Sequence, residues 1–144
     1  MNKNARLLDL KNTKFGNPHG LPTHDGRSTA TDVAKLSCIC MKQELFRTIV
    51  ACKIFKITIK NGNKSREVVW ENTNKLLRRE GFVGIKTGIT VTAGPCLATA
   101  YTFRDKTFIS VILRANKVSG RFKETRLLLN WALSKLFIKD LSDT

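Results

Sequence analysis

A run of alternating residues at positions 53–60 constrains the fold more than any other part of the sequence. Its apolar residues recur at every second position, which is the period of a strand with one face buried. These apolar residues are Phe55, Ile57 and Ile59. The dipeptide Asn61-Gly62 follows at once, and both of its residues tolerate the positive φ of a tight hairpin turn. The pattern predicts a half-buried strand, a turn and a return strand over residues 66–70.

A second antiparallel pair is predicted over residues 94–103 and 106–115, which meet near Arg104-Asp105. The segment from Phe108 to Leu113 is apolar on both faces, and such a strand is typical of the centre of a sheet. We therefore expect this segment to have a neighbouring strand on each side.

Helical patterns lie on both sides of these strands. Residues 2–10 are expected to end a helix, and residues 12–27 contain the Asn, Gly, Pro and His residues of an irregular loop. A helix capped by Ser28 or Thr29 is expected to follow, and then another helix from Gln43 to Val50.

The C-terminal helix has the clearest pattern, and Ser119 can cap it. Its predicted apolar face consists of Phe122, Leu129, Leu133, Leu136 and Phe137, broadened by Leu127, Leu128 and Trp131. A helix this apolar needs a sheet or another helix to cover it. The predicted fold class is therefore α+β, with helices first, then antiparallel strands, then a covering C-terminal helix.

The length of 144 residues suits one domain, residues 1–144. No apolar run approaches the roughly 20 residues of a membrane span, and the N-terminus has no recognisable secretory signal peptide. The net charge of +15 permits salt-sensitive association with polyanions. However, the 26 Lys and Arg residues are spread along the chain, and only Arg78-Arg79 are adjacent. No specific nucleic-acid partner is therefore predicted.

The cysteines and histidines indicate no metal site. They form no Cys-x-x-Cys pair and show no zinc-type spacing. The residues concerned are Cys38, Cys40, Cys52, Cys96, His19 and His24. We interpret the cysteines as small buried apolar residues, and no metal or organic cofactor is predicted.

The segment Gly84-Ile85-Lys86-Thr87-Gly88 carries the most informative chemistry. In serine acyl-transferases with a Lys-Thr-Gly strand, the lysine supplies a fixed positive charge and the threonine hydroxyl bonds the substrate carboxylate. The glycine lets the ligand approach the strand closely. Lys86, Thr87 and Gly88 are therefore candidate substrate-binding residues.

Six segments, in this order, carry a resemblance to a known family: Thr13–Leu21, Ser28–Ala34, Asn72–Leu77, Gly84–Thr90, Ala93–Leu97 and Leu127–Trp131. They resemble the serine-type D-alanyl-D-alanine carboxypeptidases, which are the low-molecular-weight penicillin-binding proteins of peptidase family S11. The resemblance implies a partial β-lactamase/transpeptidase-like fold and removal of the terminal D-alanine from peptidoglycan stem peptides. Arg121 matches a basic position after the last strand, which implies a further substrate contact.

Two motifs of that family are missing. An SxxK element supplies its nucleophilic serine and lysine base, and an SxN element assists proton transfer. None of the seven serines here is followed by x-x-Lys or by x-Asn, so no catalytic residue is identified. We therefore expect a C-terminal part of the catalytic domain, without its N-terminal SxxK and SxN region. Position 89 is Ile, where some members carry a polar or aromatic residue.

Three alternatives remain open for this chain. It is part of an active carboxypeptidase, or a catalytically inactive remnant that acts as a binding or structural component, or it works with a partner chain that carries both missing motifs. Once completed, the site is expected to bind a peptidoglycan stem peptide or a β-lactam. The family acts outside the cytoplasmic membrane, and the compartment of this chain stays open. Alone, residues 1–144 are expected to be marginally stable because strand edges and apolar faces would be left uncovered.

Several polar residues in the matched segments have structural interpretations. His19 is expected to hydrogen-bond within its own loop. Ser28 and Asp32 are interpreted as a cap and a first-turn acid of a helix. Asn72 and Asn74 are expected to organise a turn before the Lys-Thr-Gly strand.

Overall fold

The computed structural model describes residues 1–142, with side chains through residue 136. Its elements, in chain order, are α1 (Asn2–Leu7), α2 (Ala30–Cys40), α3 (Glu44–Ala51), β1 (Ile54–Asn61), β2 (Lys64–Glu71), the 3-10 helix η1 (Lys75–Arg78), β3 (Phe82–Thr90), β4 (Gly94–Phe103), β5 (Lys106–Ile112) and α4 (Gly120–Ser142). The predicted α+β class, with helices, then antiparallel strands, then a C-terminal helix, is confirmed.

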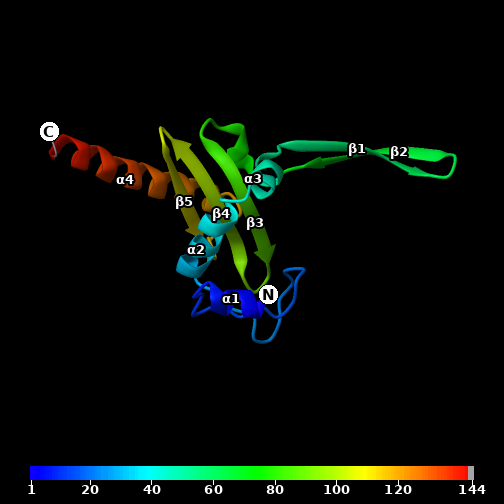
Figure 1. The fold of residues 1–144 in the computed structure, drawn as a ribbon, viewed down its shortest axis with the longest axis horizontal. Coiled ribbons are helices and arrows are strands. Elements are labelled where there is room, and N and C mark those ends of the chain that lie inside the picture. Colours follow the sequence, from blue (N-terminus) through cyan, green and yellow to red (C-terminus); the bar gives the residue numbers. More distant parts are fainter. Residues whose placement is uncertain (143–144) are drawn as a thin grey trace.

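The centre of the molecule is an antiparallel sheet of three strands in the order β3-β4-β5 (Figure 1). Helices α2 and α3 pack on one face of this sheet, and α4 packs on the other. The alternation along β4 supplies both faces, because Leu97 points to the α4 side and Ala98 and Ala100 point to the α2 and α3 side. The small alanine side chains leave room for those helices.

Two apolar clusters hold these layers together. On the α4 face, the buried side chains are Leu76, Phe82, Leu97 and Leu129. On the opposite face, Ile85, Ala98 and Ala100 are buried against partly exposed residues of α2 and α3. Burial of this kind is the main stabilising term of the fold.

The apolar strand from Phe108 to Leu113 does not lie at the centre of the sheet, as its sequence predicts. It forms most of β5, which pairs with β4 alone among the described strands. The central position belongs to β4, whose residues from Leu97 to Ala100 are buried. The prediction is wrong for the described residues because β5 has an unpaired outer edge.

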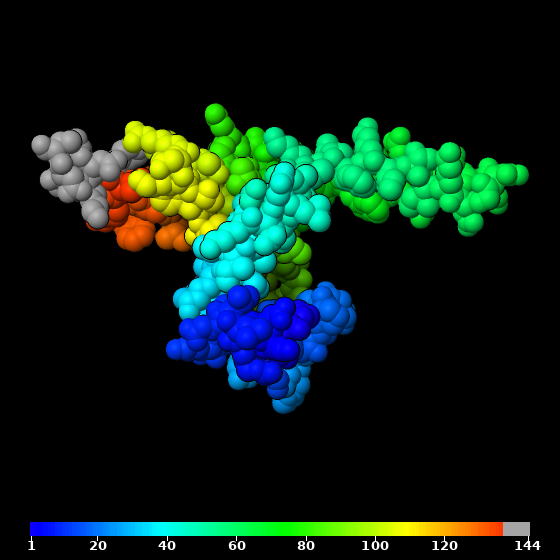
Figure 2. Space-filling view, in the orientation of Figure 1, coloured from blue at the N-terminus to red at the C-terminus, as the bar shows by residue number. Residues whose placement is uncertain are grey.

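The β1–β2 hairpin is present but its predicted burial is wrong. Gly62, with φ of 58°, lies in the turn between Asn61 and Lys64, as the Asn-Gly pair predicts. The hairpin projects from the body as an arm (Figures 1 and 2), and every residue of β1 is exposed. The alternation still marks one apolar face, because Phe55 lies opposite Trp70 and Ile57 opposite Val68.

Helix α4 buries a narrower stripe than its sequence predicts. Leu129 is buried, and Phe122 and Leu133 pack beside it against the sheet. The three residues expected to broaden that face, Leu127, Leu128 and Trp131, are exposed. The reason is that the three-stranded sheet covers only one side of the helix. The side chain of Phe137 lies outside the described part.

The cysteines also differ from their predicted burial. Cys38 is exposed, and the other three are half-buried free thiols. Within the described chain, no helix combines the length and the apolar character that crossing a membrane requires.

Candidate functional site

The Lys-Thr-Gly motif lies in the second half of β3. Because successive side chains of a strand point to opposite faces, Lys86 is exposed while Thr87 is 7% exposed. The Lys86 ammonium donates to the carbonyl oxygen of Thr87. The position of a Cβ at Gly88 has no atom within 4 Å, so the strand surface is open there. Gly88 therefore permits the close approach of a ligand.

A cavity of about 870 Å³ lies between this strand and the N-terminal loop. Lys86, Gly88 and Ile89 line one wall, and the loop from Lys14 to Ser28 lines the other. In Figure 1 the loop lies beside the end of β3. The structure thus brings two of the predicted residues, Lys86 and Gly88, to one cavity.

Arg121 reaches the motif from the start of α4. Its side chain is buried, and one terminal nitrogen, Nη1, donates to the carbonyl oxygens of Gly88 at 3.0 Å and Cys96 at 3.2 Å. Its Nε is buried and has no hydrogen-bond partner among the described residues. The guanidinium also lies 4.9 Å from the centre of the Phe122 ring. A buried positive charge therefore lies directly behind the open surface at Gly88.

Thr87 has a neighbour that sequence reasoning missed. Its hydroxyl lies 2.5 Å from the hydroxyl of Thr73, in a hydrogen bond that either oxygen can donate. The two residues are 14 positions apart, and no local pattern relates them. Thr73 lies within the matched Asn-Thr-Asn segment, which is the signal that could have pointed to it.

Asn74 fastens the segment before β3 to the strand itself. Its amide Nδ2 donates to the Gly84 carbonyl at 2.7 Å, and its Oδ1 accepts from the Leu76 amide at 3.2 Å. Asn72 in turn accepts from the Asn74 amide at 2.9 Å. The expected turn is present, and it holds the motif strand in place through side-chain amides.

Asp32 hydrogen-bonds the segment just before the loop that forms the other wall of the cavity. Its carboxylate accepts from the Asn12 amide at 2.8 Å and from the Thr13 hydroxyl at 2.7 Å. Thr29, not Ser28, caps α2 by accepting from the Asp32 amide. Ser28 instead hydrogen-bonds Thr13 at 2.9 Å and lines the cavity. Asp32 is therefore more than a first-turn acid, because it anchors the loop.

Two further contacts order the same loop. His19 accepts from the Leu21 amide at its Nδ1, at 3.3 Å, which confirms the expected contact within the loop. The Lys14 ammonium pairs with the Asp25 carboxylate. This hydrogen bond, together with the positive charge of Lys14, holds the pKa of Asp25 below its ordinary value.

The sheet with helices on both faces, and the Lys-Thr-Gly strand beside a buried arginine, define the class of penicillin-binding DD-peptidases. The chain belongs to the D-alanyl-D-alanine carboxypeptidase family, Peptidase S11, whose family model matches residues 1–117. The proposed resemblance is thereby confirmed.

Individual relatives show the same similarity. The chain is 32% identical over 137 residues to a D-alanyl-D-alanine carboxypeptidase of Streptomyces sp. strain K15. That alignment covers 93% of this chain and 47% of the relative. It is 36% identical over 133 residues to the carboxypeptidase DacC of Escherichia coli, covering 91% of this chain and 32% of the relative. The chain thus spans about half or less of the length of these curated relatives.

Solved structures agree with the fold. The crystal structure of the Streptomyces K15 DD-transpeptidase superposes with a TM-score of 0.87 at 31% identity, over 92% of this chain and 52% of that one. The carboxypeptidase DacD of Francisella tularensis superposes with a TM-score of 0.74 at 26% identity, covering 92% of this chain and 43% of that one. The expected transpeptidase-like fold is confirmed.

Proposed function

We propose that residues 1–144 supply the carboxylate-binding part of a D-alanyl-D-alanine peptidase site. The observation that carries the proposal is the convergence of three groups on one stretch of strand. Lys86 and Gly88 line the cavity, and Arg121 lies behind Gly88 with one buried nitrogen unpaired among the described residues. A free C-terminal carboxylate is the part of a stem peptide that such a site recognises.

Each residue has a separate task in this proposal. Lys86 supplies an exposed positive charge. Thr87 is buried and does not line the cavity, so its hydroxyl must exchange its bond to Thr73 for one to the substrate carboxylate when the peptide binds. Arg121 stabilises that negative charge from behind the strand, because buried charge acts in a low dielectric. Gly88 keeps the strand open so that the peptide can lie along it.

The covalent chemistry needs a serine that these residues do not supply. In the proposed reaction a serine hydroxyl attacks the carbonyl between the two D-alanines, and a lysine takes its proton. The lysine passes that proton to the leaving nitrogen as the peptide bond breaks, and the terminal D-alanine leaves as a free amino acid. Water then hydrolyses the acyl-serine ester, which releases the shortened peptide and restores the serine hydroxyl. We assign the serine and the lysine to a segment outside residues 1–144, on the same polypeptide or on a partner.

The first experiment tests carboxylate recognition without requiring catalysis. The chain, in the form that its source cells make, is titrated with a peptide ending in D-alanyl-D-alanine and with the same peptide as a C-terminal amide. We expect the free acid to bind about tenfold more tightly, because one charge-assisted pair is lost in the amide. Equal binding of the two peptides would overturn the proposal.

Matched variants locate the site. Lys86→Ala is expected to remove the preference for the free acid, whereas Lys106→Ala, at an exposed position of β5, is expected to leave it unchanged. Both changes remove one positive charge, so a general effect of net charge would appear in both variants.

A labelling experiment separates the peptidase from an inactive binding component. If the protein from its source cells reacts covalently with a fluorescent penicillin, a nucleophile completes the site and the peptidase interpretation holds. If it prefers the free-acid peptide but is never labelled, alone or with cell extract, it acts as a binding component. Labelling only after extract is added would indicate a partner chain.

A further inference from the structure

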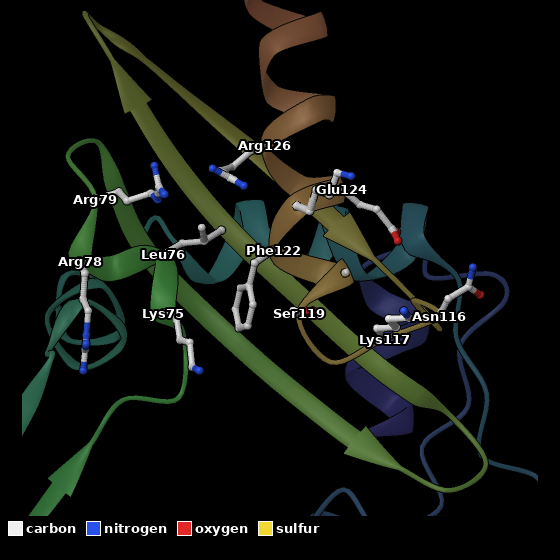
Figure 3. A pocket seen from close by; sticks show the side chains of 12 residues that line it. Lys75, Leu76, Arg78, Arg79, Asn116, Lys117, Ser119, Phe122, Glu124 and Arg126 are labelled. Carbon is white, nitrogen blue, oxygen red and sulfur yellow. The ribbon is translucent and has the colours of Figure 1, made fainter.

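A second cavity, of about 810 Å³, lies between η1 and the start of α4 (Figure 3). It shares no lining residue with the cavity beside the Lys-Thr-Gly motif. Its walls come from two separate parts of the chain, residues 75–79 and residues 116–126. The fold therefore creates this hollow from segments that lie about 40 residues apart in the sequence.

The lining of this cavity is strongly basic. Six cationic side chains line it: Lys75, Arg78, Arg79, Lys117, Lys123 and Arg126. The one carboxylate in the lining belongs to Glu124. The excess of five positive charges exceeds what the spread of charge along the sequence predicts, because the fold gathers them.

Arg79 and Arg126 point toward one another across the cavity (Figure 3). Glu124 points away from that pair, and its Oε1 lies 3.3 Å from the position of a Cβ on Gly120. The carboxylate therefore does not lie between the two guanidinium groups. Two arginines that face each other without an anion repel, and a bound anion would remove that repulsion.

Most of these cations have no ion-pair partner in the described part of the chain. Arg78 pairs with Glu71, outside the cavity. The other five form no salt bridge with a described carboxylate. Three of the same cations, Arg79, Lys123 and Arg126, also line an adjoining hollow of about 460 Å³, together with the carboxylate of Glu80.

The floor of the cavity is apolar and firmly held. Leu76 is 3% exposed and belongs to the core cluster on the α4 face, against which Phe122 packs. The positive end of the α4 dipole lies at the same place, because Gly120 begins the helix. The backbone therefore adds to the positive potential that the side chains create.

We propose that this cavity binds a ligand with two or more linked phosphate groups. The cations lie on separate sides of the hollow, so one phosphate cannot reach them all, whereas a chain of phosphates can (Figure 3). Guanidinium groups bind phosphate oxygens in pairs, and lysines add point charges around them. This inference does not depend on the peptidase proposal, because the two cavities share no residue.

The test measures binding of inorganic tripolyphosphate, with sulfate as the comparison anion, by calorimetry on the chain as its source cells make it. The double variant R79Q/R126Q is expected to weaken tripolyphosphate binding about tenfold or more. The matched control K60Q/R66Q removes the same charge from the β1–β2 hairpin and is expected to change binding by less than about twofold. Melting curves check that both variants stay folded, and the exposed positions of all four side chains favour that result.

Three outcomes would overturn the proposal: tripolyphosphate binding no tighter than sulfate, an equal loss in both double variants, or no binding to any phosphate probe. Phosphatidylglycerol vesicles, whose headgroups each carry a single phosphate, then test whether a layer of separate phosphates can replace the linked ones. Binding to tripolyphosphate but not to phosphatidylglycerol vesicles indicates a soluble oligophosphate. Binding to those vesicles, lost in R79Q/R126Q and absent with neutral phosphatidylcholine vesicles, indicates a layer of lipid headgroups.

Discussion

The molecule contains two antiparallel hairpins whose surroundings differ. The β3–β4 hairpin lies between helices and buries residues on both faces, including Leu97 at 1% exposed. The β1–β2 hairpin projects into solvent, and Ile57 on its apolar face is 40% exposed. Each has eight paired positions, in one unbroken register for β1–β2 and with a register shift between Phe82 and Gly84 for β3–β4. Pairing alone therefore does not distinguish the hairpin that carries the Lys-Thr-Gly motif from the projecting one.

The motif strand is held by other elements of the fold, whereas the arm is not. Around β3, side-chain bonds from Asn74, Thr73 and Arg121 reach the strand from other elements. Around β1 and β2, the two strands mainly contact each other, as in the stacked rings of Phe55 and Trp70, and the ion pair between Arg78 and Glu71 lies at the base of the arm. A binding strand needs such outside supports, because its geometry must persist when a ligand binds.

The largest expected difference between the two hairpins concerns buried apolar residues. Leu97→Ala is expected to lower the free energy of unfolding by about 3 kcal/mol, since it opens a cavity in a packed cluster. Ile57→Ala is expected to cost less than about 1 kcal/mol because its side chain already contacts water. Urea unfolding of both variants measures these values.

The same two variants also test whether the apolar face of the arm is exposed in the native protein. If Ile57→Ala cost as much as Leu97→Ala, the apolar face of the arm would be covered in the native protein. A surface outside the described residues would then cover that apolar face.

A smaller difference is expected for buried polar groups. Asn74→Ala leaves the Leu76 amide without its side-chain partner in the interior, and the Gly84 carbonyl keeps only its hydrogen bond from the Thr99 hydroxyl. We expect a loss of about 2 kcal/mol, because an unsatisfied buried group keeps its desolvation cost. Asn63→Ala, at the tip of the arm, is the matched control and should stay within roughly 0.5 kcal/mol. Thermal unfolding measures both variants. If Asn74→Ala and Asn63→Ala lower the stability by the same amount, Asn74 does not support β3.

The arm itself should show a measurable but weak coupling. The Phe55 and Trp70 rings lie 5.9 Å apart between centres and 7° from parallel. A double-mutant cycle with Phe55→Ala and Trp70→Ala is expected to give a coupling of about 0.5–1 kcal/mol. A coupling near zero would mean that the two strands separate at their base in solution.

The sequence predicted the elements better than their surroundings. The period of two and the Asn-Gly turn are local signals, and they located β1 and β2 correctly. Burial depends on what covers a strand. For this reason the predictions that β1 is half-buried and that β5 is central were wrong, although both strands exist.

The candidate site was predicted in part. The family resemblance pointed to Lys86, Thr87, Gly88 and Arg121, and the structure places Arg121 against Gly88 across 33 positions of sequence. Neither the bond between Thr73 and Thr87 nor the basic cavity was predicted, although the matched Asn-Thr-Asn segment pointed to the neighbourhood of Thr73. Both join residues that only the folded backbone brings together, and no periodic pattern encodes such a contact.

The smallest expected effect concerns the loop that faces the motif. Lys14 lowers the pKa of Asp25, so the folded state favours the charged carboxylate. The stabilisation is therefore present above the ordinary Asp pKa of about 4 and is lost as the pH falls through the lowered value. Because the pair is exposed, Asp25→Asn should lower the melting temperature only slightly at pH 7 and not at all at pH 2. Melting curves at both pH values measure this difference. An equal decrease at both would show that the side chain acts through packing, and the loop wall of the cavity would then not depend on charge.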